Sequence, residues 1–132
     1  MKAFFLVLLV VCGLISCKKT TVTIGKNDLA GTWVLKRVTG GIAGIDETPT
    51  DRIALTFDAH GNYNSALNVT ITASGTYTIT KAANPNDYGS ETLLNLFSDN
   101  SELIYGMHLN GDSLYLGSGC CDQFNYTYTR KK

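Results

Sequence analysis

From residue 27 onward, apolar and polar residues alternate with a period of two, and no stretch keeps the 3.6-residue apolar period of an amphipathic helix. Successive side chains of a strand point to opposite faces, so this alternation is typical of a sheet with one dry and one wet face. Thr, Tyr, Val and Ile are frequent, and Pro49 and Pro85 are the two prolines of the sequence. We therefore expect an all-β chain.

Four short turns would join neighbouring strands and keep their apolar residues on one face. Asn110-Gly111 fits a two-residue hairpin loop because both residues tolerate positive φ. Three-residue loops are expected at Ala59-His60-Gly61, Ala73-Ser74-Gly75 and Asp99-Asn100-Ser101. The facing pairs would be Met107 with Leu114, Tyr105 with Leu116, Phe57 with Tyr63, Ile53 with Leu67, Ile71 with Tyr77, Val69 with Ile79, Phe97 with Leu103 and Leu93 with Met107.

These turns predict a meander of antiparallel strands. The expected strands lie near residues 32–38, 52–58, 62–72, 76–81, 91–98, 102–109, 112–117 and 123–130. Eight strands are enough to close a small up-and-down barrel whose interior holds packed side chains or one small ligand. A barrel flattened into a sandwich is the alternative. Two longer connections, 39–51 and 82–90, contain glycine, and the first could fold over a barrel mouth or remain a surface loop.

The expected inner face is rich in tyrosine. Five inward tyrosines bring hydroxyl groups that need partners, which favours a lumen containing water or a ligand; a solid core with hydroxyls at the rim is the alternative. The residues expected to line such a site are Phe57, Tyr63, Leu67, Tyr77, Tyr105, Met107, Phe124, Tyr126 and Tyr128.

The N-terminus carries one basic residue, Lys2, before an apolar run that is too short to span a bilayer, which suits a secretory leader over residues 1–16. The run ends in Leu14-Ile15-Ser16-Cys17, which resembles the lipobox of bacterial lipoproteins. The resemblance implies cleavage before Cys17 and its modification with acyl chains such as palmitate, which would anchor the protein to a membrane. Residues 17–26 would form a flexible tether. An ordinary leader with an unmodified Cys17 is the alternative.

At the start of the expected barrel, Gly31-Thr32-Trp33 resembles the Gly-x-Trp signature of lipocalins and of small lipocalin-like bacterial lipoproteins, within a domain covering residues 27–132. Phe57, Gly61 and Tyr63 are spaced as in that family. The resemblance implies that Trp33 covers the closed end of a calycin-like barrel and that Arg130, late in the last strand, packs over it. A guanidinium stacked on an indole would tie the first strand to the last.

Cys120 and Cys121 are adjacent, so they could form a vicinal disulfide in an oxidising compartment or remain free or intermolecular thiols. No metal site is expected, because His60 and His108 lie far apart in the sequence without a carboxylate at ligand spacing. No nucleotide-binding, phosphate-binding or serine-nucleophile motif is present, so neither a cofactor nor an enzymatic activity is expected.

The 11 basic and 11 acidic residues balance, which gives no electrostatic reason to expect a nucleic-acid partner. The expected protein is a non-enzymatic, lipid-anchored lipoprotein of the bacterial cell envelope that binds a small hydrophobic ligand. The alternative is a filled barrel that serves as a structural or protein-interaction module. Lys18, directly after the anchor, favours the outer membrane by analogy with enterobacterial sorting, with the globular domain periplasmic or surface-exposed.

Overall fold

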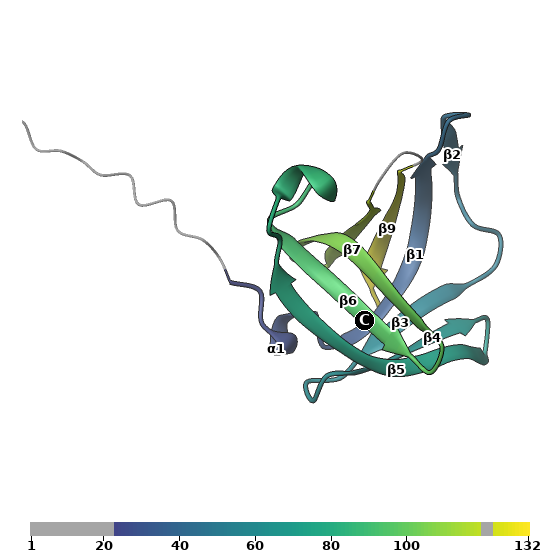
Figure 1. Ribbon diagram of the computed structural model, residues 1–132. Coiled ribbons are helices and arrows are strands. Elements are labelled where there is room, and N and C mark those ends of the chain that lie inside the picture. The colour runs from purple at the N-terminus through teal and green to yellow at the C-terminus, as the bar shows by residue number, and fades with distance from the viewer. Residues whose placement is uncertain (1–22, 120–122) are drawn as a thin grey trace, which may run out of the picture.

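The computed structural model describes residues 23–119 and 123–132, which form one antiparallel sheet rolled into a closed barrel (Figure 1). Its elements are α1 (Lys26–Leu29), β1 (Gly31–Gly40), β2 (Ile45–Glu47), β3 (Ile53–Phe57), β4 (Asn62–Leu67), β5 (Thr70–Lys81), the 3-10 turn η1 (Pro85–Asp87), β6 (Thr92–Ser98), β7 (Ser101–Asn110), β8 (Ser113–Ser118) and β9 (Phe124–Arg130). Among the described residues, no helix is long and apolar enough to cross a membrane.

Closure depends on β1, which pairs with β3 on one side and with β9 on the other. The register between β1 and β9 shifts between Leu35 and Arg37, where a bulge bends the strand. Eight strands from β1 to β9 therefore close the barrel, and β2 is a short ninth strand that pairs only with the far end of β1. The eight-strand, up-and-down, all-β barrel expected from the sequence is confirmed, in its closed rather than its sandwich form.

The turn at 59–61 is confirmed in detail. Phe57 lies opposite Tyr63 and Ile53 lies opposite Leu67, as a three-residue loop requires. Gly61 has φ +97°, a left-handed conformation that glycine adopts without a steric cost. The Asp58 carboxylate accepts hydrogen bonds from the backbone N–H groups of His60 and Asn62, both at 2.8 Å.

The expected turn at 73–75 is wrong, because β5 runs through these residues without interruption. The chain reverses instead at Asn68-Val69, where Asn68 has φ +58° and its side-chain oxygen accepts a hydrogen bond from the backbone N–H of Arg52. Gly75 serves another purpose: a Cβ there would collide with the carbonyl oxygen of Phe97 on the neighbouring strand. The shifted turn leaves Val69 and Ile71, which were expected inside, 93% and 63% exposed.

The turn between β6 and β7 has two residues, Asp99-Asn100, and not the expected three. This one-residue difference reverses the faces of β6, so Leu94 and Leu96 are buried in place of Leu93 and Phe97. The turn between β7 and β8 lies at 111–112, one residue later than expected. That shift pairs Met107 with Leu116 but keeps both on the inner face, because a change of two in pairing preserves parity.

The core fills the end of the barrel where α1 and the turns at 58–61 and 111–112 lie. Its buried members are Leu29, Trp33, Leu35, Leu55, Phe57, Tyr63, Tyr77, Leu94, Leu96, Met107, Leu114, Leu116 and Tyr128. Ile24 packs against this core and Lys26 begins α1, so the packed structure includes residues that the sequence analysis assigned to the tether.

The two longer connections do not cover a barrel mouth as the sequence suggested for 39–51. β1 and β2 form a hairpin with a tight turn at Gly41–Gly44, and Ile42 at its tip is almost fully exposed (Figure 1). The hairpin is joined by an exposed ion pair between Arg37 and Asp46. The second connection contains η1 and lies against the outer face of β7 and β8, where the Tyr88 carbonyl approaches Gly106.

Candidate functional site

The closed end of the barrel is built around Trp33, whose side chain is fully buried. Its indole Nε1 donates a hydrogen bond to the carbonyl of Leu29 at 2.8 Å, so the only polar atom of the ring is satisfied. The guanidinium of Arg130 lies over the ring, 4.2 Å from its centroid. A cation in this position is attracted by the ring by about 0.5–2 kcal/mol. The last strand is thereby attached to the first.

Arg130 also makes polar contacts around this end. It donates hydrogen bonds to the carbonyls of Ala30 at 2.5 Å and Asp28 at 2.7 Å, and its Nε lies 3.6 Å from the Asp112 carboxylate. Gly31 has φ +133°, and a Cβ there would come within 2.8 Å of a guanidinium nitrogen. The structure thus brings together the three residues that the sequence placed at the closed end.

Five of the residues expected to line a ligand site belong to the buried core: Phe57, Tyr63, Tyr77, Met107 and Tyr128. Tyr77 donates a hydrogen bond from its hydroxyl to the Asp58 carbonyl at 2.6 Å and packs edge-on against Phe57, with ring centroids 5.0 Å apart. Phe57, Tyr77 and Met107 are all at most 2% exposed. These side chains have partners within the protein, which makes them part of the closed end.

Four tyrosines other than Tyr77 form what we call the tyrosine cluster: Tyr63 on β4, Tyr105 on β7, and Tyr126 and Tyr128 on β9. The rings of Tyr105 and Tyr126 meet edge to face at 6.1 Å. None of the four hydroxyls forms a hydrogen bond with another described residue, although Tyr63 and Tyr128 are only 6% and 7% exposed. Among the described residues, no side-chain oxygen is both fully buried and without a hydrogen-bond partner.

Two of the four tyrosines, Tyr105 and Tyr128, have raised pKa values. Burial raises the pKa of Tyr105, and the nearby Tyr126 and Tyr63 raise it further. The pKa of Tyr128 is raised more strongly, by burial first and then by Tyr105 and Tyr126. Each of these effects penalises a negative charge at this place.

The inner face is exposed at the end opposite Trp33. Leu103 lies directly across from the buried Leu96 and so points to the inside of the barrel, yet it is 48% exposed. Leu67 lies across from Ile53 on the same side and is 41% exposed. Inward side chains that remain accessible mark an open end. Leu67, one of the expected lining residues, is therefore a residue of the rim.

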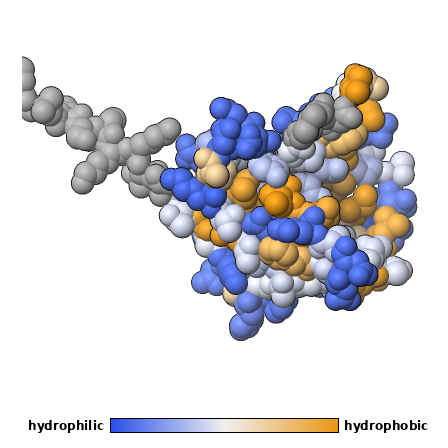
Figure 2. All heavy atoms as spheres, viewed as in Figure 1, coloured by the Kyte–Doolittle hydropathy of each residue, from blue (hydrophilic) through white to orange (hydrophobic). Residues whose placement is uncertain are grey.

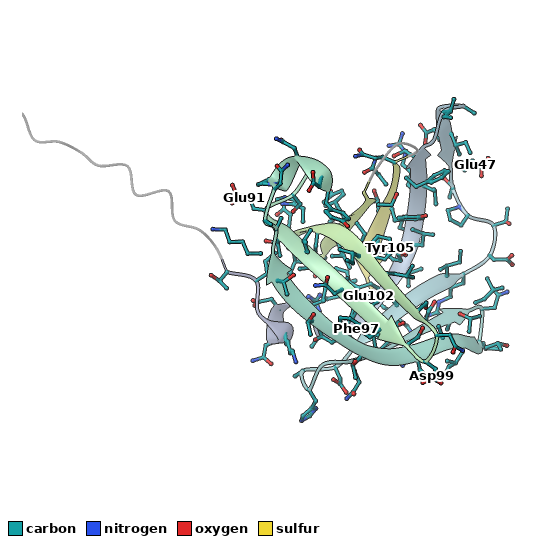
Figure 3. All side chains as sticks on the ribbon, viewed as in Figure 1. Glu47, Glu91, Phe97, Asp99, Glu102 and Tyr105 are labelled. Carbon is teal, nitrogen blue, oxygen red and sulfur yellow. The ribbon has the colours of Figure 1, made fainter. Side chains whose placement is uncertain are left out.

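The tyrosine cluster meets a hollow beside this open end. Figure 3 shows Tyr105 beside β7, with β1 and β9 behind it. β8 ends at Ser118, opposite Tyr105, so the first residues of β7 pair with no described residue on that side. A hollow of about 340 Å³ occurs there, lined by Tyr88, Glu102, Leu103, Ile104, Tyr105, Ser118, Gly119 and Tyr126.

Sequence reasoning missed Tyr88, which follows η1 and touches several hollows on the outside of the barrel. Its carbonyl lies over Gly106, and its ring lies 2.5 Å from where a Cβ at Gly119 would be. A groove of about 350 Å³ beside it is lined in part by Gly117 and Tyr115. The available signal was Gly106 within β7, its partner Gly117 on β8 and Gly119 just after β8, because a strand glycine often marks a close approach of another segment.

The remaining sequence candidates are placed as follows. Phe124 lies at the start of β9, where its ring packs beside Gly41 of the β1–β2 hairpin. Cys17, Cys120 and Cys121 lie outside the described residues. Within the described ranges, no group of three or more His, Cys, Asp or Glu side chains is arranged to hold a metal ion. His60 and His108 are both exposed.

Comparisons with protein-family models, with curated proteins and with solved structures found no match for this chain. The geometry of the open end is consequently the main guide to function. It combines apolar side chains of the inner face with hydroxyls that have no partner in the described protein, a mixture that is common in sites for small molecules.

Proposed function

We propose that this protein is a lipid-anchored, lipocalin-like protein of the bacterial cell envelope that binds a small apolar molecule and has no enzymatic activity. The observation that carries the binding proposal is the exposure of Leu103 and Leu67, which point to the inside of the barrel. Burying such side chains against a ligand would stabilise the complex by about 25 cal/mol per Å² of apolar surface. The open end offers this surface, whereas the closed end is already packed.

Hydrophobic surface around the open end supports the same proposal. Figure 2 shows orange side chains on the face over β6 and β7, interrupted by hydrophilic ones. Figure 3 places Phe97 and Glu102 on this face, and the register sets them opposite each other on the outer side of the barrel. An apolar molecule leaving a membrane would meet apolar side chains before it reached the lumen.

The position of the N-terminus bears on how an anchor would orient the barrel. Ile24 packs against the core, and α1 lies at the closed end, where Lys26 sits 5.7 Å from the centroid of the Tyr77 ring. Five residues lie between Cys17 and Thr23, and the six peptide steps from one to the other extend about 20 Å at most. An acylated Cys17 would thus attach the closed end to the membrane and leave the open end free.

The anchor is tested by replacing Cys17 with serine in the intact gene and following the protein in membrane and soluble fractions. We expect Cys17→Ser to release the protein, because the thioether cannot form. Cys12→Ser, a matched change within the leader, should leave it membrane-bound. A Cys17→Ser protein that still resists a salt wash of the membranes would contradict the lipid anchor.

Ligand binding is tested by native mass spectrometry of the protein extracted from its membranes. We expect an added mass of one small apolar molecule that disappears in Leu103→Asp, because a carboxylate at the rim would lower affinity for apolar matter. Tyr115→Asp, at a 42% exposed position on the outer face of β8, is the matched control and should retain the added mass. Binding at the open end is wrong if no adduct is found or if Leu103→Asp retains it.

A second candidate function is protein interaction, and the exposed Val69 and Ile71 favour it. They stand 93% and 63% exposed at and just after the β4–β5 turn, next to the rim residue Leu67. A partner that covers them would be lost in Val69→Asp and kept in Leu103→Asp, which can be measured by crosslinking in whole cells. This is the reverse of the pattern expected for the ligand.

A further inference from the structure

We propose that the ligand is an uncharged apolar molecule carrying a hydroxyl or carbonyl group, and that the tyrosine cluster binds this group. The inference rests on the proposed function, because it describes the ligand of the same open end. It goes further by stating which part of the ligand is polar, which residues hold that part and which charge the site rejects.

The first step is that hydroxyls from distant parts of the sequence meet in one place. Tyr63 belongs to β4, Tyr105 to β7 and Tyr126 to β9, and β4 does not pair with either of the other strands. The rings of Tyr105 and Tyr126 nonetheless meet edge to face with centroids 6.1 Å apart, and Tyr63 also raises the pKa of Tyr105. The cluster therefore reaches across the interior of the barrel.

The second step is that these hydroxyls need a partner. The closed end shows the contrast, since Tyr77 donates to the Asp58 carbonyl and Trp33 donates to the Leu29 carbonyl. The four hydroxyls of the cluster form no such bond with another described residue, and the polar group of a bound molecule would supply one. Leaving a buried hydroxyl unpaired would cost about 1–3 kcal/mol, so a bound molecule without a polar group would be at a disadvantage.

The third step concerns charge. No Lys or Arg side chain is among the described residues that line the hollow at Tyr105 and Tyr126, and its one charged member is Glu102. An anionic head group would find no cationic side chain among the described residues of this hollow and would lie near Tyr128, whose ionisation is opposed by burial. A tyrosine hydroxyl both donates and accepts, so it pairs with an alcohol or a carbonyl without a charge.

The fourth step concerns the rest of the ligand. Leu103 and Tyr105 stand two residues apart on the same face of β7, so an apolar rim directly adjoins the cluster. A molecule whose polar group reaches the tyrosines would place its hydrocarbon part against Leu103 and Leu67. A head group that binds inside and a chain that binds at the rim fit one continuous site.

The test is a comparison of three ten-carbon compounds, 1-decanol, decanoate and decylamine, binding to the purified full-length protein at about pH 7.5, measured by isothermal titration calorimetry. We expect 1-decanol to bind at least about 10-fold more tightly than either charged compound, which corresponds to about 1.4 kcal/mol. Equal or tighter binding of decanoate or decylamine would overturn the inference and leave the proposed function intact. Failure of all three to bind would count against the proposed function itself.

A second measurement tests whether the hydroxyl of 1-decanol binds to the tyrosine cluster. Tyr105→Phe and Tyr126→Phe, singly and together, remove the hydroxyls and keep the rings, so the fold should be retained. We expect each change to weaken 1-decanol binding by about 3- to 10-fold, the effect of one hydrogen bond, and to leave the binding of decane unchanged. Tyr115→Phe, on the outer face of β8, is the matched control and should change neither. The inference fails if the double variant binds 1-decanol as the wild type does, or if decane is weakened equally.

Discussion

The two ends of this barrel are made from the same strands but treat their polar groups in opposite ways. At the closed end, the Trp33 indole, the Arg130 guanidinium and the Tyr77 hydroxyl all find partners in the protein, and the apolar side chains around them are buried. At the open end, inward-pointing Leu103 and Leu67 remain accessible, and the tyrosine cluster has no partner among the described residues. Stability is therefore concentrated at one end, and the capacity to bind at the other.

Both the closed and the open end arise from the same alternation of inward and outward side chains along the strands. Residues at alternate positions point inward along the whole of β9, so Tyr126 and Tyr128 share a face with Phe124. What differs is the cover: α1 and Arg130 cap the Trp33 end, whereas the β1–β2 hairpin stands away from the other end with Ile42 exposed (Figure 1). In residues 23–119 and 123–132, the Trp33 end carries a cap and the other end does not, and this difference separates the buried inward side chains from the exposed ones.

The largest loss of stability is expected for Trp33→Ala. This change removes a fully buried ring, leaves the Leu29 carbonyl without its donor and takes away the surface under Arg130. We expect a loss of about 3–5 kcal/mol in the free energy of unfolding, measured by urea denaturation. An unchanged urea midpoint would mean that the closed end does not hold the barrel together.

A matched pair of leucines compares the two ends directly. Leu94 on β6 is fully buried, and Leu103 on the adjacent β7 also points inward but is 48% exposed. We expect Leu94→Ala to cost about 2–5 kcal/mol and Leu103→Ala to cost less than about 1 kcal/mol, because only the first creates a cavity in packed surroundings. Similar losses for both would remove the distinction between a packed and an open end.

Arg130→Lys is expected to have a smaller effect. A lysine keeps the charge, but it cannot stack a planar group on Trp33 while donating to both the Ala30 and Asp28 carbonyls. We expect a loss of about 1–2 kcal/mol in thermal or urea denaturation. Arg37→Lys serves as the control, because Arg37 pairs with Asp46 at a fully exposed site and its replacement should not measurably change stability. Equal effects of the two changes would contradict a special role for Arg130.

The smallest expected effect on stability is that of Tyr128→Phe, and it is confined to high pH. Burial, together with Tyr105 and Tyr126, raises the pKa of Tyr128 in the folded protein, whereas an unfolded tyrosine ionises near about pH 10. Below that pH the hydroxyl is neutral in both states; above it the unfolded chain loses the proton first, so stability falls as the pH rises. Tyr128→Phe should therefore lose less stability than the wild type between about pH 9 and 11. Parallel curves for the two proteins would count against a partly dry cluster.

The sequence was sufficient for the fold because alternation survives small errors of register. Placing the β7–β8 turn one residue early still left Met107 and Leu116 on the inside, since the pairing changed by two. The β6–β7 turn shows the limit: a loop of two residues rather than three exchanged the faces of β6 and brought Leu94 and Leu96 into the core. Loop length, which local sequence signals specify poorly here, decided which face was buried.

Among the sequence features used to place turns, glycine was the least reliable. Gly61 and Gly75 follow similar small or polar residues, yet the first forms a turn with φ +97° and the second lies within β5 because the Phe97 carbonyl passes close to it. The distinction depends on a strand that is distant in the sequence. The same limit applies to the site: alternation predicted that Tyr105 and Tyr126 face inward, but whether they are capped depends on where α1 and the β1–β2 hairpin pack.

The difference between the two ends is tested most directly by measuring contacts with water. In the purified protein with isotope-labelled tyrosine and tryptophan rings, magnetisation transfer from water to the ring protons can be compared by nuclear magnetic resonance. We expect clear transfer to Tyr63, Tyr105, Tyr126 and Tyr128 and none to Trp33, because solvent reaches the cluster but not the closed end. If the four tyrosines are as dry as Trp33, the lumen is filled and the proposed binding site does not exist.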